Sequence, residues 1–96
     1  MKDLDANTAG VAILHWVADH ILEKLKTDTA LFTPCALGEQ IWTVGIQRIQ
    51  GVDDKVVRID TLVPEGRARL TEGSKFVMQS GPEVFATGII WVPPKV

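Results

Sequence analysis

The chain has 96 residues, of which 46% are hydrophobic and 23% are charged, and its formal net charge is −2. This composition excludes an intrinsically disordered chain, and the length predicts one domain over residues 1–96 with one modest core. The charge balance does not favour a free-standing nucleic-acid binder, because such proteins concentrate positive charge to neutralise phosphates. The basic residues of the second half are instead interleaved with acidic ones, as Arg48 and Arg58 are with Asp53, Asp54 and Asp60.

Cysteine content and apolar segments bear on the cell compartment. Cys35 is the only cysteine, so one chain can form neither an internal disulfide nor a thiolate cage for a metal. The first residues lack the basic-then-apolar order of a secretion signal, and the apolar stretch at 9–18 is too short to span a bilayer. We therefore expect a cytoplasmic protein that does not enter the membrane and holds no metal or cofactor.

The region 8–26 has the spacing of an amphipathic helix. Asn7 or Thr8 is suited to cap its first turn, and Lys24 and Lys26 place cations in its last turn. The sequence therefore predicts an N-terminal helix at about 8–26 that has an apolar stripe and buries Leu14, Ala18, Ile21 and Leu25. The stripe recurs at three- and four-residue steps and consists of Val11, Leu14, Ala18, Leu22 and Leu25.

The remainder of the chain is predicted to be a loop at 27–39 followed by a β-region at 40–92. Thr33 precedes Pro34, which disfavours continued helix. Alternating residues at 40–50 and 55–63, separated by turn residues at 51–54, predict a β-hairpin, and shorter strands are expected at 67–70, 75–79 and 84–92. The predicted fold is α+β: one N-terminal amphipathic helix followed by a small antiparallel β-barrel, or a strongly curved meander, of about five to six strands.

Residues 70–90 contain a more specific pattern. A leucine, an acidic residue, glycine, a basic residue and phenylalanine are followed by alternating apolar residues, a glycine, and a small-x-glycine step before two β-branched residues. The positions are Leu70, Glu72, Gly73, Lys75, Phe76, Met78, Gly81, Ala86, Gly88, Ile89 and Ile90. This pattern resembles the closing strands of the C-terminal β-barrel domain of elongation factor Tu and related translational GTPases.

The resemblance carries expectations for the fold and for the function. It implies that 75–79 and 84–92 pair as antiparallel strands with Phe76 and Met78 inside a barrel. In that family the barrel is a docking surface for RNA and protein partners, so the resemblance implies a binding module. The phosphate loop of those GTPases has no counterpart in this chain, so GTP binding does not carry over.

Four residues are candidates for a protein interface: Trp16, His20, Ile13 and Trp91. Trp16 falls on the polar arc of the predicted helix, one turn before His20. Tryptophan is the residue type most enriched at binding hot spots, although a loop folded over Trp16 would also explain it. Trp91 precedes two prolines and is expected at a barrel rim.

Catalytic groups are not indicated. His15 and Asp19 would meet one helical turn apart, but solvation of an exposed helix face is the better explanation. Cys35 has no signature of a nucleophile around it and is expected to be a small buried side chain. We therefore predict a non-enzymatic binding or adaptor module that meets a protein partner or a second copy of itself, as a homodimer, through the helix and the barrel surface.

Two alternatives stay open. The first is a small-ligand-binding barrel or small enzyme with a site between helix and sheet that uses His15, His20 or Cys35, which requires a cavity lined by these groups. The second is an RNA-binding barrel, which requires the arginines of the strands to converge on one face.

Overall fold

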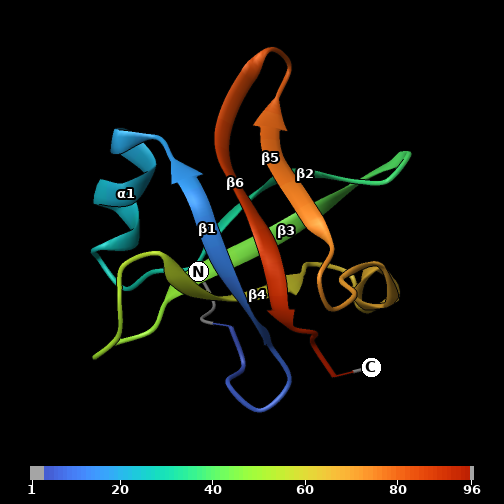
Figure 1. Ribbon diagram of the computed structural model, residues 1–96, viewed down its shortest axis with the longest axis horizontal. Helices are drawn as coiled ribbons and strands as arrows, with labels where there is room; N and C mark the ends of the chain where they lie inside the picture. The colour runs from blue at the N-terminus through green and yellow to red at the C-terminus, as the bar shows by residue number, and fades with distance from the viewer. Residues whose placement is uncertain (1–3, 96) are drawn as a thin grey trace.

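The structure, a computed structural model, describes residues 4–95 and contains a closed antiparallel barrel of six strands. The strands are β1 (Gly10–Val17), β2 (Leu31–Leu37), β3 (Gln40–Arg48), β4 (Val56–Thr61), β5 (Lys75–Ser80) and β6 (Glu83–Val92). Around the barrel their order is β1-β4-β3-β2-β5-β6, and β6 closes onto β1. A short helix, α1 (Asp19–Leu25), follows β1 and lies at one side of the barrel, and a 3-10 helix, η1 (Pro64–Arg69), joins β4 to β5 (Figure 1).

The predicted helix at 8–26 is wrong over its first half. Residues 10–17 form strand β1, and only Asp19–Leu25 is helical, so the helix is not N-terminal. The predicted burial of Leu14, Ile21 and Leu25 is nevertheless confirmed, because these side chains enter the core from the strand and from the helix, whereas Ala18 between the two elements is only partly buried. In β1 the buried residues Gly10, Ala12 and Leu14 alternate with partly or fully exposed ones, which is the two-residue period of a strand.

The predicted loop at 27–39 is also wrong, because it contains strand β2. β2 pairs with β3 along its whole length, from Leu31 opposite Ile46 to Leu37 opposite Gln40. On its other side β2 pairs with β5 only at Cys35 and Ala36. Pro34 is exposed just before this short pairing begins, so its missing N–H removes no hydrogen bond from the β2–β5 ladder.

The hairpin predicted from local alternation is confirmed, and so is the strand pairing implied by the resemblance of residues 70–90. β3 pairs with β4, and β5 pairs with β6 with Phe76 and Met78 buried inside the barrel. The strand predicted at 67–70 is wrong, since 64–69 form η1, and Pro64 in its first turn suits a helix start, where no backbone donor is needed.

The barrel interior is filled by side chains from all six strands and from α1. The largest fully buried side chains are Phe76, Leu14, Leu25, Ile46, Ile59, Leu70, Met78, Ile90, Val44, Val57 and Cys35. Within residues 4–95, neither helix has the length and apolar character that crossing a membrane requires.

Candidate functional interface

The outer face of the β1–β6 ladder brings together three of the four predicted interface residues. Ile13 on β1 lies directly opposite Ile89 on β6, and both are partly exposed. The same row continues to Val56 on β4 and to Lys75 on β5. Two isoleucines and a valine therefore form an apolar strip across three neighbouring strands.

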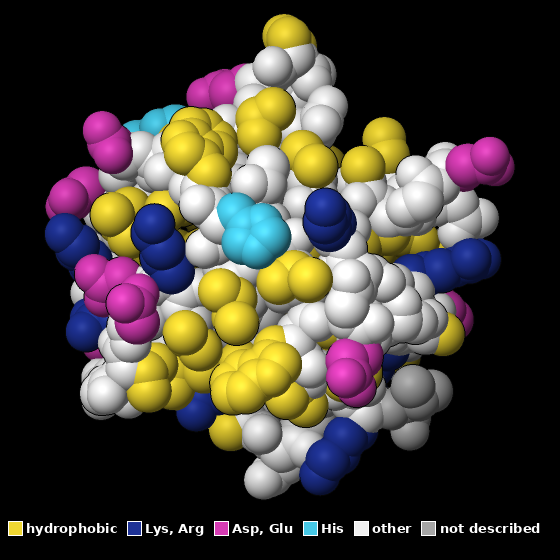
Figure 2. Space-filling view, viewed as in Figure 1, with side chains coloured by type: hydrophobic (Ala, Val, Ile, Leu, Met, Phe, Trp, Pro, Cys, Tyr) yellow, Lys and Arg dark blue, Asp and Glu magenta, His cyan; other side chains and the backbone are white. Residues whose placement is uncertain are grey.

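The two exposed tryptophans lie on opposite sides of the Ile13–Ile89 pair. Trp16 is paired with Thr87, two residues before Ile89, whereas Trp91 comes two residues after Ile89. Their exposed fractions are 49% for Trp16 and 59% for Trp91. Figure 2 views this side of the barrel and shows hydrophobic side chains gathered along its centre. We call this surface, made by Val11, Ile13, Trp16, Ile89, Trp91 and Val92, the β1–β6 face.

Each tryptophan lies at an irregularity of the ladder. The register shifts between Leu14 and Trp16, where β1 carries the extra residue His15, and again between Val11 and Ala12, where β6 carries the extra residue Trp91. Such bulges are over-represented at barrel rims and re-aim a side chain. Between the bulges the strands are unusually close, because a Cβ on Gly88 would lie 2.5 Å from the carbonyl oxygen of Ile13.

His20 lies beside the β1–β6 face rather than on it. It is the second residue of α1, and its Nε2 atom lies 3.7 Å from a carboxylate oxygen of Glu83 at the start of β6. Its ring meets the ring of Phe85 edge-on, with 6.1 Å between the centroids. The predicted helical neighbours Trp16–His20 and His15–Asp19 do not exist as such, because residues 15 and 16 are in a strand.

Cys35 is a core residue, as predicted. Its side chain is fully buried in β2, and this burial raises the pKa of the thiol to about 12, against a smaller opposing effect of the Val77 backbone. A thiol with so high a pKa is a poor nucleophile at neutral pH. Three surface hollows lie on residues 4–95, and none of these three is lined by His15, His20 or Cys35.

The arginines gather only in part: Arg48 and Arg58 border one hollow, whereas Arg67 lies on η1. Arg67 on η1 donates from Nε and Nη2 to the two carboxylate oxygens of the buried Asp60, at 3.0 and 3.1 Å. Arg48 lies between Asp28 and Asp54, whereas Arg58 lines the same surface hollow as Arg48. In residues 4–95, His, Cys, Asp and Glu side chains form no group of three that could hold a metal ion.

Sequence reasoning missed Ile89 and the Arg48–Arg58 hollow. The strand spacing of 84–92 places Ile89 and Trp91 on one side of β6, but nothing local shows that β1 lies beside them. The hairpin register places Arg58 opposite Gln47, yet Asp28 joins this site from a distant loop, with a left-handed backbone (φ 62°).

No family model, curated protein or solved structure matches this chain. The resemblance of residues 70–90 to the elongation factor Tu barrel therefore stays a prediction.

Proposed function

We propose that this protein is a non-enzymatic binding module that associates with a second copy of itself through the β1–β6 face. The observation that carries the proposal is the arrangement of the two exposed tryptophans about the Ile13–Ile89 pair. Exposed aromatic anchors around an apolar centre are typical of binding hot spots, whereas singly scattered apolar residues are ordinary on protein surfaces.

The arrangement on the β1–β6 face suits a symmetric dimer. In a two-fold interface, residue i of one protomer contacts residue j of the other, and j contacts i. Along β6, Trp91 lies two residues after Ile89. Thr87, which pairs with Trp16 of β1, lies two residues before Ile89. At about 3.3 Å per residue, the two tryptophans are displaced by about 7 Å in opposite directions. A two-fold axis lying in the interface and crossing the strands at Ile13–Ile89 would set Trp16 against the partner's Trp91, twice.

A standard interface takes about 800 Å² from each partner, which is about a seventh of the 5564 Å² that the chain exposes. Burying one large apolar side chain contributes about 1.5–3 kcal/mol. A micromolar dimer requires about 8 kcal/mol, and the four tryptophans and four isoleucines of two protomers, which are partly buried already, are the main source of this free energy.

The predicted route through the helix is replaced by this face. Trp16, which motivated the helix as an interface, belongs to β1, and the apolar residues of α1, Ile21 and Leu25, are already buried within the chain. The alternative of a ligand site between helix and sheet lacks a comparable supporting feature because the barrel interior is filled. The RNA-binding alternative lacks one because Arg67 is engaged by Asp60, outside the hollow that Arg48 and Arg58 border.

Sedimentation equilibrium at micromolar concentrations tests the proposal. We expect a dimer for the unmodified protein, and at least a tenfold weaker association for Trp91→Ala and for Trp16→Ala, since each substitution removes contacts twice per dimer. Ile41→Ala is the matched control, because Ile41 is 75% exposed in the β2–β3 hairpin and outside the β1–β6 face. A monomer at every concentration, or equal weakening by Ile41→Ala, contradicts the proposal.

A further inference from the structure

A polar hollow lies where the loop after α1 meets the ends of β3 and β4. Its volume is about 290 Å³, which corresponds to roughly ten water molecules at about 30 Å³ each. It is lined by Asp28, Gln47, Arg48, Ile49, Gln50 and Arg58. The lining residues carry two positive charges and one negative charge, and the carboxylate of Asp54 lies against Arg48 beside them.

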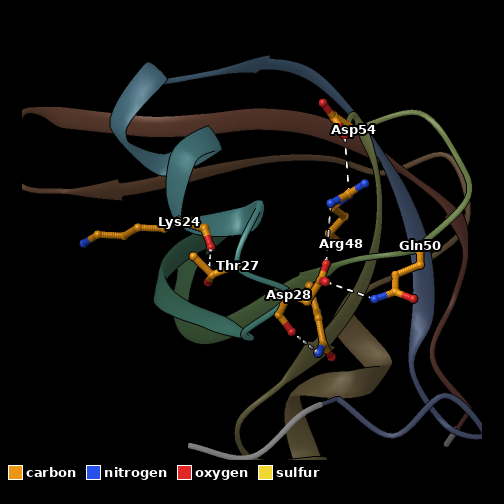
Figure 3. Close-up of polar contacts among 7 residues, drawn as sticks. Lys24, Thr27, Asp28, Arg48, Gln50 and Asp54 are labelled. Atoms are coloured by element: carbon orange, nitrogen blue, oxygen red, sulfur yellow. Dashed lines mark hydrogen bonds and ion pairs between the residues drawn. The ribbon is translucent and has the colours of Figure 1, made fainter.

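Arg48 enters this hollow with hydrogen-bonding capacity to spare. Its Nη1 lies 3.7 Å from Asp28 Oδ1 and its Nε lies 3.5 Å from Asp54 Oδ1 (Figure 3). Both distances are those of ion pairs, and neither contact is a hydrogen bond. The Nε atom is buried without a protein acceptor. The Asp28 Oδ1 atom that faces Arg48 is likewise buried without a hydrogen-bond partner, so Arg48 is held between two carboxylates by charge while its N–H donors make no hydrogen bond to residues 4–95.

Arg58 provides the second cation. It lies on the outer side of β4, opposite Gln47 on β3 and Val11 on β1. Within residues 4–95, no ion pair or hydrogen bond engages its guanidinium group. Two arginines that border one hollow can bind an oxyanion. Each guanidinium group offers paired N–H donors, which the ammonium group of lysine does not.

The wall of the hollow is held in place by hydrogen bonds. Gln47, only 6% exposed, donates from Nε2 to the Asp28 carbonyl at 2.8 Å and accepts from the Leu4 amide at 2.9 Å. Gln50 donates to Asp28 Oδ2 at 3.0 Å, and the dashed lines of Figure 3 show how these side chains converge on Asp28. Asp28 therefore orients Arg48 while the N–H donors of Arg48 make no hydrogen bond within the described part of the chain. Because this wall is already ordered, binding an anion costs little further conformational entropy.

From this geometry we infer that the hollow is a binding site for a phosphate group, held by Arg48 and Arg58. The inference goes beyond self-association and does not depend on it. The phosphate can belong to the inorganic ion or to a phosphate monoester, because both present the oxygen atoms that the two guanidinium groups recognise. The volume leaves room for a small substituent beside the phosphate.

NMR titration at constant ionic strength tests the site. Inorganic phosphate and methyl phosphate are added separately, and the guanidinium Nε–Hε signals and backbone amides of 47–50 and 58 are followed. We expect saturable shifts for at least one probe. Saturation by both means that the site binds the phosphate group itself, and saturation by methyl phosphate alone means that it takes an ester. Absence of saturable shifts with both probes overturns the inference.

Two variants make the test specific to the hollow. Arg58→Gln is expected to weaken binding at least tenfold without affecting folding, since Arg58 is not part of the hydrogen-bonded wall. Arg48→Lys keeps the charge but loses the paired donors, and it is expected to weaken binding as well. Arg69→Gln, an exposed arginine on η1, is the matched control and should leave the titration unchanged. Equal effects of Arg69→Gln and Arg58→Gln would show nonspecific attraction and overturn the inference.

Discussion

The aromatic side chains on two opposite sides of the barrel differ in what covers them. On the β2–β3 side, the ring of Phe32 lies against Gly45, and the ring of Trp42 lies against Gly66 of η1. On the β1–β6 side, Trp16 and Trp91 are about half exposed. The segment before β1 crosses toward β3, where the Leu4 amide donates to Gln47, and the turn of η1 closes over Trp42.

This difference separates structural aromatics from candidate binding aromatics. Trp42 packs against η1 and the core, and Phe32 packs against Gly45 of the neighbouring strand, so the partial burial of both rings contributes to the stability of one chain. Within residues 4–95 no segment lies over Trp16 and Trp91 in the same way, so burying them requires another molecule. The comparison therefore assigns stability to the β2–β3 side and supports the proposed association through the β1–β6 face.

The largest expected effect comes from truncating the covered tryptophan. Trp42→Ala removes the ring that packs against Gly66 and the core, and it should lower the free energy of unfolding by about 3 kcal/mol. Trp91→Ala, measured at a concentration low enough to keep the chain monomeric, should cost less than about 1 kcal/mol because the ring is already exposed. Urea unfolding of both variants checks this, and equal losses would remove the distinction between the two sides.

A smaller contrast is expected for two glycines on the two sides. A Cβ at position 88 would approach the backbone oxygen of Ile13 to 2.5 Å, and backbone atoms in a ladder cannot rotate away. A Cβ at position 45 would approach the Phe32 ring to 2.6 Å, and that side chain can shift. We expect Gly88→Ala to cost about 3 kcal/mol and Gly45→Ala about 1 kcal/mol in thermal or urea unfolding. A larger loss for Gly45→Ala would contradict the close β1–β6 approach.

The smallest effect concerns thiol reactivity rather than stability. The pKa of Cys35 is raised to about 12 by burial, so almost no thiolate exists in the folded protein at pH 8. Its alkylation by iodoacetamide should therefore be no faster than unfolding. Lys75→Cys, placed in the row of Ile89, should react rapidly under the same conditions. Fast labelling of Cys35 in the folded chain would show that the β2 side of the barrel opens.

Cys35 also gives a pH dependence with a definite sign. Because its folded pKa lies above the ordinary value of 9.0, its contribution to stability is complete below pH 9.0 and is lost as the pH rises toward about 12. Cys35→Ala should therefore show a flatter fall in unfolding free energy across this range than the unmodified protein. A parallel fall in both would assign the alkaline loss to other groups.

The hairpins could be predicted from sequence because their information is local. Alternation and turn residues specify the β3–β4 hairpin, whereas the β5–β6 pairing with Phe76 and Met78 inside was implied by the pattern of residues 70–90. β1 was not predictable in the same way, because its outer residues Val11, Ile13 and Trp16 are also apolar. With both faces apolar the two-residue period is hidden, and the spacing of Leu14, Ala18 and Leu25 fits a helix equally well.

The candidate site depends on closure of the barrel, which short-range patterns do not encode. Trp16 and Trp91 were predicted individually, but their placement about Ile13–Ile89 requires the first and last strands to pair. Likewise, Arg48 and Asp28 come together only because the loop after α1 returns to the end of β3. The sequence therefore indicated which residue types could bind a partner, but it did not indicate which of them lie side by side in the barrel.

Chemical cross-linking across the proposed two-fold axis tests the central claim most directly. Lys75 lies in the row of Ile13 and Ile89, close to the axis that would pair each Trp16 with the partner's Trp91. Facing sheets pack about 10 Å apart, so a short bis-maleimide is suited to join Lys75→Cys to its copy. We predict rapid formation of a covalent dimer for Lys75→Cys, and little for Ile41→Cys, whose position is 75% exposed but outside the β1–β6 face. Cross-linking of Lys75→Cys no faster than that of Ile41→Cys would contradict association through this face.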